Sequence, residues 1–191
     1  MFFVVLALLT KDSELLIKDV SLNPTRTECL NILKRMGGNI EVEERGVSNN
    51  EVYGDVFVKS SELQNVHIDK FIVPLIIDEI PILAVAGIFA RGVFELRGAS
   101  ELRVKESDRI NAICANLLKV GLNVEEYKDG FEISGTIKKP TEPFNSFGDH
   151  RIAMAFSILS SLLKDGGEVE GFESVSVSNP DFLKQLKSIS S

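Results

Sequence analysis

One pattern recurs three times along the chain and constrains the fold more than any other feature. It consists of an apolar helix, a strand, a polar turn, an amphipathic helix and a further strand. The copies run through "FFVVLALL", "SELLIKDV", "NPTRTECLNILKRMGG" and "NIEVE"; "IPILAVAGIFA", "GVFELRG", "KESDRINAICANLLKVG", "LNVEEY" and "GFEISG"; and "HRIAMAFSILSSLL", "GEVEGF" and "NPDFLKQLKSI". The first helix of each copy is apolar almost all round, which predicts that strands enclose it. We therefore predict an α/β fold with buried central helices, in one domain over residues 1–191.

Composition narrows the possible partners and the compartment. With 44% hydrophobic residues in 191, the chain can build a substantial core, and its net charge of −7 argues against a nucleic-acid partner. Cys29 and Cys114 fall in predicted helices without the spacing of a metal site. We interpret both as reduced core residues of a cytoplasmic protein.

The first ten residues, "MFFVVLALLT", resemble an export signal only superficially. They have no basic leader and fall short of the roughly 20 apolar residues that cross a bilayer, so no membrane association is expected. A buried helix is the better interpretation. Nothing precedes this helix that could cap it, which suggests that the chain is part of a longer one.

The stretch "RVKESDRI" places cations at the wrong end of a helix. Ser107 is a candidate N-cap, so Lys105 and Arg109 bracket the helix start. The amino end of a helix carries about half a positive charge and normally favours acidic residues. The dipole argument predicts that removing such a cation costs little stability.

Two other helix starts are similar. "NPTR" places Arg26 in a first turn, and "GDHR" places His150 and Arg151 after Asp149, a candidate cap. The simplest explanation is that these cations reach solvent. If the repeats instead direct the helix starts to one mouth, cations and free N–H groups would form an anion-binding site.

Carboxylates accompany these cations. Asp78 and Glu79 come just before the second apolar helix, and Glu106 lies inside the basic stretch. Asp78 could be an N-cap and Glu106 a surface partner of Arg109. Either carboxylate could instead transfer protons beside a bound anion.

The stretches "ELRVKESDRI" and "GDHRIAMAF" resemble the enolpyruvyl transferase family, and "LNPTRTECLNILKRMGG", "LIIDEIP" and "NPDFLKQL" also fall in the family's order and spacing. The resemblance spans nearly the whole chain. It implies an enolpyruvyl transferase-like domain of repeated βαβαββ units with buried central helices, an inside-out α/β barrel. The family's enzymes have two such domains, so an amino-terminal domain would be missing here, and we expect a monomer.

The resemblance also implies a reaction without metal or cofactor, in which phosphoenolpyruvate donates its enolpyruvyl group to the 5-hydroxyl of shikimate 3-phosphate. Asp78 would be the base at that hydroxyl, and Glu106 the acid at the methylene carbon. Cations around phosphoenolpyruvate would be Lys105, Arg109 and Arg151, with His150 beside them.

Two positions depart from the family's pattern. Glu101 stands where some members have an asparagine near the shikimate phosphate, and Val177 where some have a lysine. Two alternatives remain open: a transferase acting on UDP-N-acetylglucosamine, and a non-catalytic anion-binding module of the same fold.

Overall fold

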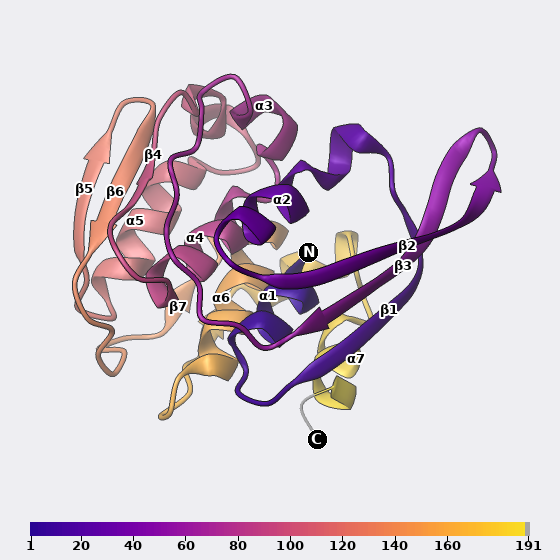
Figure 1. Cartoon of the computed structure of the whole chain (residues 1–191). Coiled ribbons are helices and arrows are strands. Elements are labelled where there is room, and N and C mark those ends of the chain that lie inside the picture. The colour runs from indigo at the N-terminus through magenta and orange to yellow at the C-terminus, as the bar shows by residue number, and fades with distance from the viewer. Residues whose placement is uncertain (190–191) are drawn as a thin grey trace.

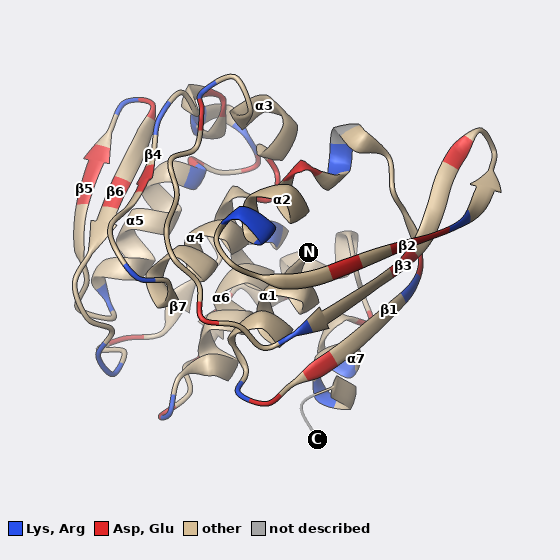
Figure 2. Cartoon of the chain, in the orientation of Figure 1, with Lys and Arg blue, Asp and Glu red and all other residues tan. Residues whose placement is uncertain are grey.

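Three apolar helices form the centre of the molecule. In a computed structural model that describes residues 1–189, Thr25 by its backbone alone, they are α1 (Phe2–Leu9), α4 (Ile80–Phe89) and α6 (His150–Leu162). Each packs against the other two, and the strands lie around them (Figure 1). Figure 2 shows that charged residues gather on the surrounding elements and are scarce along these helices. The predicted buried helices are confirmed.

The elements around the central helices repeat in order. The first unit contains β1 (Glu14–Ser21), α2 (Pro24–Arg35), β2 (Asn39–Ser48) and β3 (Glu51–Lys59). The second contains β4 (Phe94–Leu96), α5 (Arg109–Leu118), β5 (Asn123–Tyr127) and β6 (Gly130–Ser134). Both form antiparallel sheets with the last strand in the middle, in the orders β1-β3-β2 and β4-β6-β5. This shared topology supports the predicted repeat.

The third unit contains one more strand than predicted, although both of its strands are short. Its strands β7 (Phe144–Asn145) and β8 (Val169–Glu170) pair in parallel, and α7 (Phe182–Ile189) follows. We expected only a loop before α6, and that prediction was wrong because tertiary pairing recruits β7 from a Pro- and Gly-containing segment. The three sheets stay separate within the described residues, so the expected barrel does not close.

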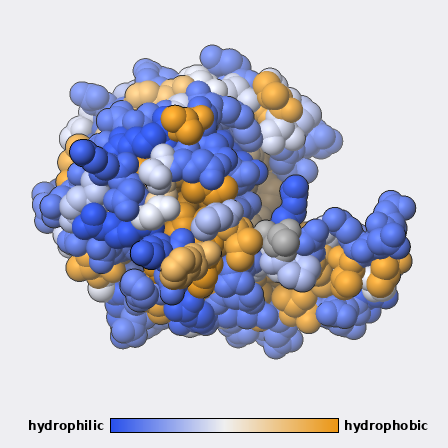
Figure 3. All heavy atoms as spheres, turned by 90° about the horizontal axis from the view of Figure 1, so that it is seen from above, coloured by the Kyte–Doolittle hydropathy of each residue, from blue (hydrophilic) through white to orange (hydrophobic). Residues whose placement is uncertain are grey.

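Short helices interrupt the connections and were not predicted. They are α3 (Val73–Ile76), η1 (Ser100–Val104) and η2 (Phe172–Val177). The hairpin between β2 and β3 projects from the body of the molecule, and Figure 3 shows apolar residues exposed among hydrophilic ones on the upper face.

Both cysteines lie in the core, as predicted. Cys29 and Cys114 are free, and burial raises the pKa of each thiol to about 12, so both are neutral. Among the described helices, none combines the length and the apolar composition required to span a bilayer.

The fold brings together residues that are far apart in sequence. Arg109, the first residue of α5, contacts Asp149 just before α6 and Asp78 just before α4. The starts of α5 and α6 therefore lie together, as the anion-site hypothesis predicts, and α4 begins beside them.

Candidate anion-binding site

The start of α5 is capped by an acidic residue. Asp108 precedes the helix and its side chain accepts a hydrogen bond from the Asn111 N–H at 3.0 Å. The prediction that Ser107 is the cap was wrong, because Ser107 lies one residue too early and its hydroxyl instead donates to Asp149 at 3.3 Å. Asp108 offsets part of the dipole that faces Arg109.

The start of α6 is capped by Asp149, as predicted. Its carboxylate accepts hydrogen bonds from the N–H groups of Arg151, at 2.9 Å, and Ile152, at 3.3 Å. This carboxylate is fully buried. A buried charge needs a partner of opposite charge, and Arg109 supplies it.

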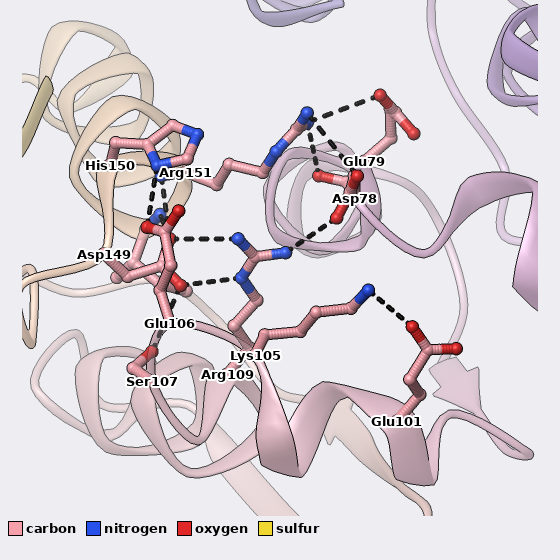
Figure 4. Close-up of polar contacts among 11 residues, drawn as sticks. Asp78, Glu79, Glu101, Lys105, Glu106, Ser107, Arg109, Asp149, His150 and Arg151 are labelled. Carbon is pink, nitrogen blue, oxygen red and sulfur yellow. Dashed lines mark hydrogen bonds and ion pairs between the residues drawn. The ribbon is translucent and has the colours of Figure 1, made fainter. Parts of the chain in front are cut away.

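Arg109 lies at the centre of the site (Figure 4). Its Nε donates to Asp149 Oδ2 at 2.7 Å and its Nη1 to Asp78 Oδ1 at 2.9 Å, and only 3% of the side chain is exposed. Burial lowers the pKa of Arg109, but the hydrogen bond and charge of Asp149 outweigh it and the net pKa is raised. The guanidinium thus stays charged and fixed between two carboxylates.

Arg151, in the first turn of α6, approaches Asp78 as well. Its Nη1 donates to the Asp78 carbonyl oxygen at 2.8 Å, and its Nη2 lies 3.7 Å from Asp78 Oδ2. The alternative that Asp78 is an N-cap is wrong, because Glu79 occupies the cap position of α4 and neither carboxylate caps the helix.

The two adjacent carboxylates differ in acidity. Partial burial raises the pKa of Asp78, but Arg151 and Arg109 outweigh it and the net pKa is lowered. Burial raises the pKa of Glu79, Arg151 opposes that shift from 3.4 Å, and the negative charge of Asp78 adds to it. Asp78 is therefore the stronger acid of the pair.

Glu106 pairs with His150 rather than with Arg109. The His150 Nδ1 lies 2.7 Å from Glu106 Oε2, while Arg109 is occupied by its two aspartates (Figure 4). The alternative that Glu106 is a surface partner of Arg109 is therefore wrong. Glu106, Asp149 and His150 could together offer ligands to a cation, but both Asp149 oxygens already accept from Arg109, which makes a metal there unfavourable.

The remaining predicted residues lie at the margin or elsewhere. Lys105 Nζ contacts Glu101 Oε1 at 2.5 Å, with the lysine side chain 25% exposed. Val177 is exposed at the end of η2. The Arg26 side chain is exposed, in agreement with the simpler interpretation that it reaches solvent.

Sequence reasoning identified Asp149 as a cap but missed its central role. Besides capping α6, the Asp149 carboxylate pairs with Arg109 and accepts a hydrogen bond from the Ser107 hydroxyl. A signal was present, since "SDR" and "GDHR" both place an aspartate before a cation at a helix start.

The arrangement can bind an anion by exchange. Arg109, Arg151 and Lys105 are all paired with carboxylates, so an anion with several negative oxygens would replace some of these contacts. Asp78 is 44% exposed and Glu106 48%, so both can reach a bound molecule.

Comparison with known proteins gives one consistent result. The chain is 46% identical over 191 residues to the 3-phosphoshikimate 1-carboxyvinyltransferase of Petrotoga mobilis, covering 100% of this chain and 44% of that protein. The enzyme of the same name from Leptospira interrogans is 43% identical, with coverage of 98% and 45%.

A solved structure agrees with these relatives. The chain resembles EPSP synthase from Acinetobacter baumannii with a TM-score of 0.90 and 36% identity, over 98% of this chain and 44% of that one. The chain thus spans less than half the length of the proteins it matches. A family model described as EPSP synthase (3-phosphoshikimate 1-carboxyvinyltransferase) matches residues 1–186, and the chain belongs to that family.

Proposed function

We propose that this chain is one half of an enzyme that transfers the enolpyruvyl group of phosphoenolpyruvate to the 5-hydroxyl of shikimate 3-phosphate and releases phosphate. The observation that carries the proposal is the convergence of Arg109 and Arg151 on Asp78, two cations for an anionic substrate beside a candidate base. The family membership and the relatives' names support the choice of reaction.

The arginines bind phosphoenolpyruvate in this proposal. Each guanidinium can hold a carboxylate or phosphate through two parallel hydrogen bonds, and Lys105 adds a third positive charge. The charges stabilise the tetrahedral intermediate and the departing phosphate without reorganising during the reaction, because Arg109 is already fixed by Asp149.

Two carboxylates transfer protons. Asp78 accepts the proton of the 5-hydroxyl of shikimate 3-phosphate as the hydroxyl oxygen attacks C2 of phosphoenolpyruvate. Glu106 donates a proton to C3 of phosphoenolpyruvate. The bond between C2 and the phosphate oxygen then breaks, Glu106 takes back a proton from C3 so that the double bond is restored, and the proton held by Asp78 leaves with the phosphate. His150 orients Glu106 through their 2.7 Å contact.

Binding of the anion prepares Asp78 for this role. The arginines lower the pKa of Asp78 against the effect of its partial burial, which makes it a weak base in the free site. When the substrate takes over the guanidinium groups, Asp78 loses this stabilisation and its pKa rises toward a value better suited to accept a proton.

Domain organisation follows from the same proposal. Residues 1–191 form one domain of a monomeric enzyme, and an amino-terminal domain closes over the exposed carboxylates and holds the shikimate phosphate. Glu101, which pairs with Lys105, reduces the positive charge on the side where that phosphate binds.

Reconstitution tests the function. The chain is mixed with the separately produced amino-terminal half, and phosphate release is measured with phosphoenolpyruvate and shikimate 3-phosphate. We expect release with this acceptor, none with UDP-N-acetylglucosamine, and none from an Asp78→Asn and Glu106→Gln double variant. Anion binding without release for either acceptor would favour the non-catalytic module instead.

A further inference from the structure

The turn that carries Lys105 and Glu106 has no regular structure of its own. Residues 105–107 are bends between η1 and α5, with Val104 before them largely exposed. The backbone in such a segment makes few hydrogen bonds and opens easily unless side chains fix its ends. Besides the contacts of Glu106 with His150 and of Ser107 with Asp149, one residue that the proposed reaction does not use joins the two ends of this turn.

That residue is Arg103. Its Nη1 donates to Asp108 Oδ2 at 2.9 Å and Oδ1 at 3.1 Å, and to Glu126 Oε1 at 2.6 Å. Its Nε donates to the Lys128 carbonyl oxygen at 3.2 Å, and its Nη2 donates to the Tyr127 carbonyl oxygen. Every nitrogen of the guanidinium therefore has a partner, and the side chain is only 25% exposed.

These contacts close the turn. Arg103 precedes the segment and Asp108 follows it, so their ion pair joins its two ends. Asp108 also caps α5 through the Asn111 N–H, so the pair fixes the turn to the start of the helix. Glu126, Tyr127 and Lys128 belong to β5 and the turn that follows, which attaches the whole unit to the second sheet.

In the part of the chain that the structure describes, Arg109 and Arg151 share no ion-pair partner with Arg103. Arg109 pairs with Asp149 and Asp78, and Arg151 with Asp78 and Glu79. Loss of Arg103 would leave these contacts in place. Its effect should fall on the turn alone, and so on Lys105 and Glu106.

We propose that Arg103 is a positioning residue that holds the turn bearing Lys105 and Glu106 in its working geometry. The role in turnover rests on the proposed function, whereas the role in fixing the turn does not. Arg103 acts through Glu106 and has no contact with the charged groups of the anion site among the contacts described.

Three variants separate positioning from general stability. Arg103→Gln removes the ion pairs, and Arg103→Lys keeps the charge but cannot reach all the partners of the planar guanidinium. The matched control is Arg97→Gln, because Arg97 also belongs to the second unit, pairs with Glu95 and stacks on the Tyr127 ring.

Hydrogen exchange of the chain on its own tests the turn directly. We expect the amides of residues 104–109 in Arg103→Gln to exchange at least about tenfold faster, while those of β5, β6 and α6 stay within about twofold. Arg103→Lys should be intermediate and Arg97→Gln unchanged in residues 104–109. Unchanged exchange there in Arg103→Gln, or equal acceleration throughout the chain, would overturn the proposal.

Kinetics of the reconstituted enzyme test the consequence. Displacement of Glu106 by about 1 Å can reduce turnover by about 10–100-fold. We expect that loss in kcat for Arg103→Gln, with a smaller rise in the KM for phosphoenolpyruvate, because Lys105 moves with the turn while both arginines remain fixed. A loss confined to KM would contradict the proposal. If the unsubstituted enzyme releases no phosphate, the proposed function fails and hydrogen exchange alone decides the role of Arg103.

Discussion

Arg109 donates a 2.9 Å hydrogen bond to Asp78, so the proposed anion-binding cation and the proposed base neutralise each other in the free site. Arg151 reinforces this arrangement by contacting both the carboxylate and the backbone carbonyl of Asp78. The site is thus stable without its substrate, and anion binding must disrupt ion pairs that already exist.

Removing the competing charge should therefore strengthen anion binding. In Asp78→Asn, both guanidinium groups lose a carboxylate partner, and the gain should correspond to a partly exposed ion pair of up to about 1 kcal/mol, or about threefold to fivefold in affinity. Titration calorimetry with inorganic phosphate measures it on the chain alone. Asp165→Asn, an exposed charge that is not part of the site, is the control. Weaker phosphate binding in Asp78→Asn would show that the two groups do not compete.

Anion affinity should also depend on Glu79. Burial raises the pKa of Glu79 while the arginines keep that of Asp78 low, so Glu79 is protonated first as the pH falls. Its neutralisation frees Arg151 from one competitor, so binding of sulfate, which stays a dianion, should tighten by up to about twofold as the pH falls from neutral into the range where carboxyl groups are protonated.

The control for this effect is Glu79→Gln. Glu106 and His150 form another pair of ionisable groups in the same site, so the quantity that reports on Glu79 is the difference in pH dependence of sulfate affinity between the unsubstituted chain and Glu79→Gln. We expect the affinity for sulfate to change less steeply with pH in Glu79→Gln than in the unsubstituted chain. Identical slopes would remove Glu79 from the pH response.

The two arginines should differ in their effects on stability. The dipole argument predicted little cost for either, but Arg109 is buried and its loss would leave the fully buried Asp149 without its cation. Arg109→Ala should lower the free energy of unfolding by about 3 kcal/mol. Arg151→Ala, with a side chain 25% exposed, should lower it by about 1 kcal/mol.

Urea denaturation at neutral pH measures both changes. The Asp149 carboxylate keeps its hydrogen bonds to two N–H groups in either variant, so the helix cap itself is not the source of the difference. Equal unfolding midpoints for the two variants would mean that the dipole, and not the buried pair, dominates.

Glu106 should matter for chemistry more than for binding. Glu106→Gln keeps the shape of the side chain and can still contact His150, but it cannot donate or recover a proton at C3. Turnover of the reconstituted enzyme should fall by about 10²–10⁴-fold while phosphoenolpyruvate affinity stays similar. Steady-state kinetics with both substrates decide this. Normal turnover with poor binding would make Glu106 a structural partner of His150.

The central helices could be predicted because their signal is local. The residues of α1 and α4 are apolar without interruption, so these helices can be recognised from their own sequence, without knowledge of what packs against them. β7 could not be predicted, because its two residues form a strand only by pairing with β8, which lies after α6 in the chain.

The ion pairs within the site could not be predicted from the sequence either. Helix starts and their charges can be identified locally, but the partner of a charge depends on how the repeats are oriented. Glu106 is three residues before Arg109 in sequence and yet pairs with His150, because Asp149 and Asp78 already occupy the arginine. Local spacing offered Arg109 as a partner of Glu106 but could not decide the pairing.

The last prediction is that the chain alone binds anions weakly and does not catalyse. Asp78 and Glu106 are about half exposed, so water and salt reduce each electrostatic contact that a substrate would make with the site. The reaction requires two anionic molecules in line with water excluded, and the chain is less than half as long as the enzymes it matches. We expect salt-sensitive phosphoenolpyruvate binding by calorimetry, no heat with shikimate 3-phosphate, and no phosphate release until the amino-terminal half is added. Steady release by the purified chain would show that this half-site is sufficient for the reaction.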